Sequence, residues 1–275
     1  MTDITRKNDL MQWRTFRVAG IDGPHCREQE AHVAAEEPLT IRINGQPLVT
    51  LMRTPGEEIP LCVGFLLTEG VVASYADILL VRHCRNAAAS DDVENPNVVN
   101  AKLRDSVDVS QVKHRVAYSS CGICGAEAID LICRSVKPLQ ACQTQASILA
   151  DLPGKMRRHQ RLFAETGGTH AAALFDAAGE LLFLSEDIGR HNALDKTVGK
   201  AAIREADLSG KLLMLSGRIS YEMIAKAARA GIATVAAVSA PTTLAVETAI
   251  KLGITLIGFV RDGRLTIYAG YGNLP

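Results

Sequence analysis

The second half of the chain repeats one pattern, in which short apolar runs alternate with longer amphipathic segments. The apolar runs predict strands, and the amphipathic segments, two of which end at Gly231 and Gly253, predict helices. Such alternation is typical of β-α-β crossovers over a largely parallel sheet. The expected strands are 170–175, 180–184, 212–215, 234–238, 255–260 and 264–268, and the expected helices are 192–205, 221–230 and 242–252.

The first half follows a different pattern. Residues 39–52 alternate apolar and polar positions around Asn44-Gly45, which predicts a hairpin with a type I′ turn. The next segment, Thr54-Pro55-Gly56-Glu57, has the cap, proline and carboxylate of a helix start, so we expect a helix from there to Gly70. Cys62 is expected in its core face. Two further strands are expected at 78–82 and 98–103.

These patterns place the protein in the α/β class, with a division into four parts. Residues 1–32 are polar and contain several turn-forming residues, so we expect a flexible N-terminal arm. A small α+β domain follows at 33–115, then a cysteine-containing loop and connecting helix at 116–144, and then an α/β domain with a mostly parallel sheet at 145–275.

A helix is also expected at 151–163, with Asp151 as its cap and Pro153 near its start. It carries a run of basic residues, which is typical of a solvated helix face. The run consists of Lys155, Arg157, Arg158 and Arg161.

Composition narrows the function. Thirty basic residues balance thirty acidic ones, which gives no support to a general nucleic-acid or membrane-surface role. The apolar runs are too short to span a bilayer, and the N-terminus lacks the apolar stretch of a secretory signal. Seven cysteines at irregular spacings suggest no disulfide framework and fit a reducing cytoplasm.

Cys121 and Cys124, flanked by Gly122 and Gly125, are the candidate reactive centre. Two thiols three positions apart can face one point, and a following helix N-terminus favours a thiolate. Half of a zinc site, a thioredoxin-like dithiol and a loop with merely buried cysteines are the alternatives. Zinc lacks a second closely spaced ligand pair, and more than a hundred residues precede the pair, unlike a thioredoxin unit. Nucleophilic sulfur chemistry is therefore favoured, and no bound metal is expected.

The expected strand ends of the second domain carry polar, glycine-containing segments. Ligands of α/β sheets collect at the carboxyl ends of strands, where glycines and helix N-termini accept phosphates and arginines pair with their charge. An anionic-ligand site is therefore expected here, with His170 nearby. Its candidate residues are Gly189, Arg190, His191, Ser216, Gly217 and Arg218.

Taken together, these motifs resemble one family, the formate dehydrogenase accessory sulfurtransferases (FdhD). The resemblance runs in order from about residue 33 to 268, and its longest and most specific segment is 187–196. The motifs that carry it are Thr54-Pro55-Gly56-Glu57, Glu69-Gly70, Cys121-Gly122-Ile123-Cys124-Gly125, Glu165-Thr166-Gly167-Gly168-Thr169-His170, Asp187-Ile188-Gly189-Arg190-His191-Asn192-Ala193-Leu194-Asp195-Lys196 and Ser216-Gly217-Arg218.

The resemblance implies a cytoplasmic, homodimeric persulfide carrier whose second domain is cytidine deaminase-like. It implies that Cys121 takes sulfur from a cysteine desulfurase and delivers it to the molybdenum cofactor of formate dehydrogenase. In the family this cofactor is a bis(molybdopterin guanine dinucleotide), bound partly by the segment that matches Phe259, Val260, Arg261, Asp262, Gly263 and Arg264. The role of Cys124 stays open.

Two limits apply to this interpretation. Nucleobase deamination is excluded, because a zinc deaminase needs His-x-Glu or Cys-x-Glu and Pro-Cys-x-x-Cys, and Ser120 stands where the proline would be. A second interpretation remains, in which the protein is a non-catalytic cofactor chaperone with a redox-active cysteine pair. The two interpretations differ on whether sulfur leaves Cys121.

For the guanine of the cofactor, Phe259 is the expected flat apolar neighbour.

Overall fold

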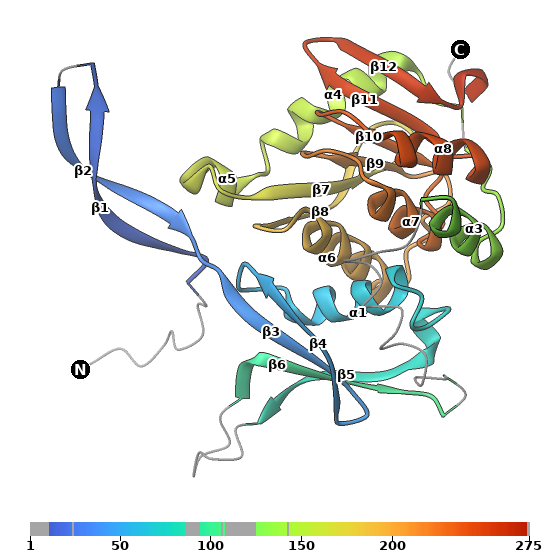
Figure 1. Ribbon diagram of the computed structural model, residues 1–275, viewed down its shortest axis with the longest axis horizontal. Coiled ribbons are helices and arrows are strands. Elements are labelled where there is room, and N and C mark those ends of the chain that lie inside the picture. Colours follow the sequence, from blue (N-terminus) through green and yellow to red (C-terminus); the bar gives the residue numbers. More distant parts are fainter. Residues whose placement is uncertain are drawn as a thin grey trace.

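The computed structural model describes residues 11–23, 25–85, 94–105, 107, 125–141 and 143–273 of the 275-residue chain. It shows a small α+β unit joined to a larger α/β unit, with a β-hairpin projecting from the side (Figure 1). A mixed α/β fold is thus confirmed. The cytidine deaminase-like description and the domain boundaries stay predictions. Among the described residues, no helix is both long and apolar enough to cross a bilayer.

The expected N-terminal arm contains a projecting β-hairpin, which the sequence pattern did not predict. Strands β1 (Trp13–Asp22) and β2 (His25–Ala34) pair antiparallel over ten residues each. Most of their side chains are exposed, which is why the segment looks like a polar linker in the sequence. Backbone pairing, rather than a buried apolar face, defines these strands.

The α+β unit contains a four-stranded sheet in the order β4-β3-β6-β5, covered on one face by helix α1. The hairpin turn is as predicted, since Asn44 and Gly45 both have positive φ. The strands are β3 (Glu37–Ile43), β4 (Gln46–Arg53), β5 (Ile78–Arg85) and β6 (Glu94–Leu103), with a 3₁₀ turn at Tyr75–Asp77.

Helix α1 (Glu58–Thr68) begins later than expected. Thr54 does not cap it, because the chain turns first and the residue before the helix, Glu57, is left-handed with φ 63°. The Thr54 hydroxyl instead accepts a hydrogen bond from the Ile188 backbone N–H of the other unit, at 3.1 Å. Cys62 lies fully buried in the core under α1, as predicted.

The α/β unit contains a six-stranded sheet in the order β12-β11-β10-β9-β7-β8. The prediction of a mostly parallel sheet is wrong. Only the pairs β9–β10 and β10–β11 are parallel, and β7 pairs antiparallel with both of its neighbours. The strands are β7 (His170–Phe175), β8 (Leu181–Asp187), β9 (Leu212–Leu215), β10 (Thr234–Ala237), β11 (Thr255–Arg261) and β12 (Arg264–Ala269).

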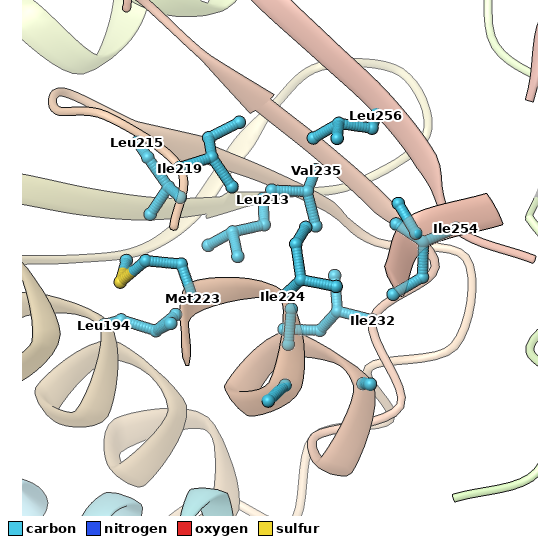
Figure 2. Close-up of a cluster of buried hydrophobic side chains, with 14 of the residues drawn as sticks. Leu194, Leu213, Leu215, Ile219, Met223, Ile224, Ile232, Val235, Ile254 and Leu256 are labelled. Atoms are coloured by element: carbon cyan, nitrogen blue, oxygen red, sulfur yellow. The ribbon is translucent and has the colours of Figure 1, made fainter. Parts of the chain in front are cut away.

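Helices cover both faces of this sheet. On one face α6, α7 and α8 pack on residues such as Leu213 and Val235 (Figure 2), with α3 beside them. On the other face Leu149, Leu152 and Met156 of α4 pack on Phe175 and its neighbours. The helices are α3 (Gly125–Ser135), α4 (Ala146–Arg157), α5 (Arg161–Thr166), α6 (Arg190–Ile203), α7 (Tyr221–Arg229) and α8 (Thr243–Leu252), with a 3₁₀ turn at Tyr271–Asn273.

The single helix expected at 151–163 is instead two helices, α4 and α5. Asp151 and Pro153 lie inside α4, which begins one turn earlier at Ala146 because apolar Leu149 already faces the core. Helix α4 ends at Arg157, residues 158–160 form a turn, and α5 begins at Arg161.

The two units meet where α1 lies against α6 (Figure 1). Glycines permit a very close approach of the two backbones. A Cβ atom on Gly64 would lie 1.8 Å from the carbonyl oxygen of Asp195, and one on Gly199 would lie 1.9 Å from that of Pro60. Any larger side chain at either position would force the helices apart.

Candidate functional site

The predicted ligand-binding segments do gather at one edge of the six-stranded sheet, although the sheet is mixed. Strand β7 runs antiparallel to both β8 and β9, so β8, β9, β10 and β11 all point the same way. Their carboxyl ends therefore share an edge with the amino end of β7. This edge carries the Asp187–Arg190 segment, the Ser216–Arg218 segment, His170 and Arg261.

A pocket of about 880 Å³ opens at this edge. It lies between the C-terminal half of α4, helix α5 and the ends of β7, β9, β10 and β11. We call it the basic pocket. Its side chains relevant to binding are Asp151, Lys155, Arg157, Arg158, Gln160, Phe163, His170, Ser216, Arg261 and Asp262.

The basic pocket has an excess of positive charge. Lys155 is engaged by Glu180, with its Nζ 2.9 Å from Oε1. Arg157, Arg158 and Arg261 are exposed, and within the described part of the chain they form no ion pair. Guanidinium groups with no carboxylate partner are suited to bind phosphate groups of a ligand.

His170 lies half-buried on the pocket wall beside the Ser216-Gly217 turn. Its Nδ1 is 3.5 Å from the Ser216 hydroxyl, which itself accepts a hydrogen bond from the Ala171 backbone N–H. Burial lowers the pKa of His170, and the nearby Arg190 guanidinium lowers it further, against an opposing effect of Asp187. His170 is thus neutral at pH 7 and contributes hydrogen-bonding capacity rather than charge.

This turn can approach His170 closely because Gly217 has no side chain. A Cβ atom at Gly217 would lie 3.2 Å from the histidine Nδ1 and 3.8 Å from Cδ of Arg190. The glycine thus lets both His170 and Arg190 approach this turn closely.

The candidate residues of the sequence analysis fall into two groups. Ser216, Arg261 and Asp262 line the basic pocket, and Gly217 touches its wall through His170. The remaining described candidates do not line it: Gly189, Arg190, His191, Arg218, Phe259, Val260, Gly263 and Arg264.

The segment from Phe259 to Arg264 comprises the end of β11, a tight turn at Asp262-Gly263 and the first residue of β12. Phe259, Asp262 and Gly263 all have positive φ, and the register shifts between Gly258 and Arg261. Residue Phe259 is 38% exposed, and Cζ of Arg261 lies 5.8 Å from the centre of its ring. Val260 is buried in the core, so only its backbone can reach a ligand.

Most of the specific 187–196 motif lies in a buried contact between the two units. Asp187 is fully buried, and it accepts hydrogen bonds from Asn192 Nδ2 and from the backbone N–H groups of Thr54 and Gly189. Lys196 Nζ lies 2.7 Å from its carboxylate and also donates to the Thr54 carbonyl. This motif therefore connects α6 to the turn before α1.

A second buried cluster lies farther along the same contact. Lys226 Nζ is 2.6 Å from Glu69 and 2.9 Å from Asp195, and the Thr68 hydroxyl donates to Asp195 at 2.7 Å. Burial alone would lower the pKa of Lys226, but the two carboxylates raise it, so the ammonium stays charged. We call these two clusters, with Gly64 and Gly199, the interdomain joint.

His191 lies at the edge of this joint rather than in the basic pocket. Its Nε2 is 3.9 Å from Glu222. Burial, with Arg190 and Lys226 nearby, lowers the pKa of His191 to about 4. The ring is thus neutral at pH 7, which does not favour a role in holding phosphate.

The two cysteines of the candidate reactive centre, Cys121 and Cys124, lie outside the described residues, which resume at Gly125 with helix α3. Within the described ranges, no group of three or more His, Cys, Asp or Glu side chains is arranged to hold a metal ion. The roles of both cysteines and the expected absence of zinc stay predictions.

The sequence analysis did not identify three residues that line the basic pocket. Arg157 and Arg158 belong to the basic run expected on a solvated face, and Phe163 received no role. The two arginines are exposed, as expected for such a face, but they also line the basic pocket. One signal could have found them: the run lies only a few residues before the glycine-rich segment that leads into β7.

Comparisons with known proteins identify a family and relatives that this chain resembles. The family model described as the FdhD/NarQ family matches residues 34–274. A protein from Streptomyces coelicolor named sulfur carrier protein FdhD is 44% identical over 247 residues, covering 86% of this chain and 87% of that protein. One of the same name from Sulfurisphaera tokodaii is 36% identical over 264 residues, covering 94% and 97%.

A solved structure shares the fold. It is the crystal structure of a putative formate dehydrogenase accessory protein from Desulfotalea psychrophila, with a TM-score of 0.77 at 20% sequence identity. The match covers 96% of this chain and all of that one.

Proposed function

Since this chain belongs to the FdhD/NarQ family, as its motifs predict, we propose that it is a sulfurtransferase that works through a cysteine persulfide. It takes one sulfur atom from a cysteine desulfurase. It delivers that atom to a molybdenum cofactor, a bis(molybdopterin guanine dinucleotide), for the activation of formate dehydrogenase. We include in this proposal a homodimeric state and a cytoplasmic location.

The sulfur chemistry uses the two thiols of the Cys121–Cys124 loop. The Cys121 thiolate attacks the outer sulfur of the donor's persulfide, the S–S bond of that persulfide breaks, and the donor cysteine leaves as a thiolate. Cys124 then attacks Sγ of Cys121 to form a disulfide and release the carried sulfur as sulfide. The dithiol supplies the two electrons for this release, and a cellular thiol reductant restores it.

The observation that carries the acceptor half of the proposal is the basic pocket. Arg158 and Arg261 offer guanidinium groups to phosphates at an edge where ligands of α/β sheets collect. The molybdenum cofactor is here the substrate that receives sulfur. About 880 Å³ is within the range of a pocket for one nucleotide-sized ligand, so it suits one guanine dinucleotide arm rather than the whole cofactor.

Intact mass spectrometry tests the sulfur half. The protein is incubated with a cysteine desulfurase and cysteine, and we expect a gain of one sulfur atom that a reductant removes. Cys121→Ala should abolish the gain. The matched control is Cys26→Ala, whose thiol is exposed on β2 and should not be needed.

The same experiment separates sulfur transfer from the alternative of a non-catalytic cofactor chaperone with a redox-active cysteine pair. A chaperone would form the Cys121–Cys124 disulfide but gain no sulfur. Normal activation of formate dehydrogenase in cells by Cys121→Ala would contradict the sulfurtransferase proposal. Elemental analysis that finds about one zinc ion per chain, absent when Cys121 and Cys124 are replaced, would also contradict the proposal.

A further inference from the structure

An aromatic ring and a guanidinium group are stacked in the wall of the basic pocket. Cζ of Arg157 lies 4.0 Å from the centre of the Phe163 ring, and both residues line the pocket. Arg157 is exposed, so the face of its guanidinium that points away from Phe163 is open. Flat guanidinium groups and aromatic rings are the surfaces on which nucleobases stack.

Buried hydrogen bonds hold the Phe163 half of this pair in place. Phe163 sits on the short helix α5, whose first backbone N–H groups, at Leu162 and Phe163, both donate to the buried carboxylate of Glu186 at 2.9 and 2.8 Å. The same carboxylate accepts a hydrogen bond from the Thr169 hydroxyl. Glu186 therefore fixes α5 against the start of β7 before any ligand arrives, which lowers the entropic cost of binding.

The pair and Arg261 lie at different positions along the edge of the sheet. Phe163 is attached at the β7 end of the pocket and Arg261 at the end of β11, with β10 and β9 between them. Three strand spacings of about 4.8 Å separate these ends by roughly 14 Å. An extended nucleoside diphosphate spans such a distance between its base and its terminal phosphate.

We propose that Phe163 and Arg157 form the base-stacking platform of the basic pocket, and that the ligand lies along the sheet edge with its phosphates toward Arg261. This inference rests on the proposed function, since it locates the nucleotide end of that ligand. It moves the base contact away from Phe259, which does not line the pocket. Because stacking reads the flat face of a base, the platform supplies affinity rather than a choice among bases.

Titration calorimetry with GDP tests the platform. Phe163→Leu keeps an apolar side chain but removes the ring, and Arg157→Lys keeps the charge but removes the flat guanidinium. Each variant should bind GDP about five- to a hundredfold more weakly than the wild type. Pyrophosphate, which has no base, should compete for the site equally well in all three proteins.

The chain offers a matched control pair. Arg204 lies over the ring of Phe183 at 5.7 Å, and neither residue lines the basic pocket. Phe183→Leu and Arg204→Lys should leave GDP affinity unchanged. Thermal melts of all variants check that they are folded, and Arg157→Lys, at an exposed position, still tests the platform if Phe163→Leu is unstable.

Each other outcome has one meaning. If Arg261→Ala weakens GDP but Phe163→Leu and Arg157→Lys do not, the platform is wrong and the pocket assignment stands. If the platform variants weaken pyrophosphate as much as GDP, their role is electrostatic or structural, and the platform is again wrong. If the wild type does not bind GDP, or if no pocket variant changes its affinity, both the platform and the acceptor half of the proposed function are overturned.

Discussion

The basic pocket and the interdomain joint are made from the same kinds of residue, but their charges have different surroundings. In the joint, Lys196 and Asp187 are at most 1% exposed, and Lys226 contacts two carboxylates and a hydroxyl. In the pocket, Arg157, Arg158 and Arg261 are exposed. Charges that are already compensated by the protein stabilise the fold, whereas exposed charges facing a cavity remain available to a ligand.

This comparison shows that a specific motif need not be a binding site. The 187–196 segment is the longest motif that carries the family resemblance, yet its buried polar groups contact the turn before α1 and the end of α1. Buried ions need partners with good geometry, because desolvation is costly. These polar residues therefore have a structural reason to be present that involves no ligand. The predictions below test the contrast, from the largest expected effect to the smallest.

Lys226→Met should break the joint. It leaves the carboxylates of Asp195 and Glu69 buried without their cation, so we expect a loss of about 3–5 kcal/mol in the free energy of unfolding. Urea denaturation measures it. The control is Lys251→Met, which removes a largely exposed lysine 3.6 Å from Asp130 and should change stability by less than about 0.5 kcal/mol. Equal effects would mean that the joint contributes no more than a surface pair.

Gly199→Ala should separate the two units without changing any charge. Its new methyl would lie 1.9 Å from the Pro60 carbonyl oxygen, so α1 and α6 must move apart. We expect a loss of about 3 kcal/mol in the free energy of unfolding.

The matched control for this change is Gly154→Ala in helix α4, where a Cβ atom meets nothing within 4 Å. That substitution should be neutral or slightly stabilising, because alanine favours helix more than glycine does. A stable Gly199→Ala protein would show that the close contact between the helices can relax.

Arg261→Ala should affect binding but not stability, the reverse of the joint variants. Loss of one charge-assisted phosphate contact should weaken GDP by about 1.5–3 kcal/mol, roughly ten- to a hundredfold, in titration calorimetry. The unfolding midpoint should stay that of the wild type. Arg218→Ala is the comparison variant. Arg218 is exposed but does not line the basic pocket, so its replacement should weaken GDP binding less than Arg261→Ala does.

His191→Gln should change the pH dependence of stability. The folded-state pKa of about 4 is below the ordinary value of 6.5, so the unfolded chain binds the proton more readily. Stability from this group is present above pH 6.5 and is lost as the pH falls toward 4. The ring is 36% exposed, which reduces the expected loss to about 1 kcal/mol. Urea midpoints between pH 7 and 4 should fall less in the variant. Identical curves would contradict this assignment.

Local pattern was sufficient for most of the helices and strands. The turn at Asn44-Gly45, strand β9 and the alternation from β9 to β11 follow from turn chemistry and periodicity, and they appear where expected. The family assignment needed only the order of the motifs, and it is confirmed. The edge of the sheet that carries the basic pocket could also be expected, because strand ends with glycine and arginine lie at one edge whichever way β7 runs.

Tertiary structure alone decided which of these residues bind one another and which face the pocket. The direction of β7, the pairing of β1 with β2, and the late start of α1 depend on contacts between segments far apart in the chain. Whether a lysine or arginine is free for a ligand depends on whether a carboxylate lies beside it. For Lys196 and Lys226 that carboxylate is buried next to the ammonium, whereas Arg157 and Arg261 face an open pocket. Because distance and burial set the energy of a charge, the sequence identifies the charged residues but only the fold determines what they do.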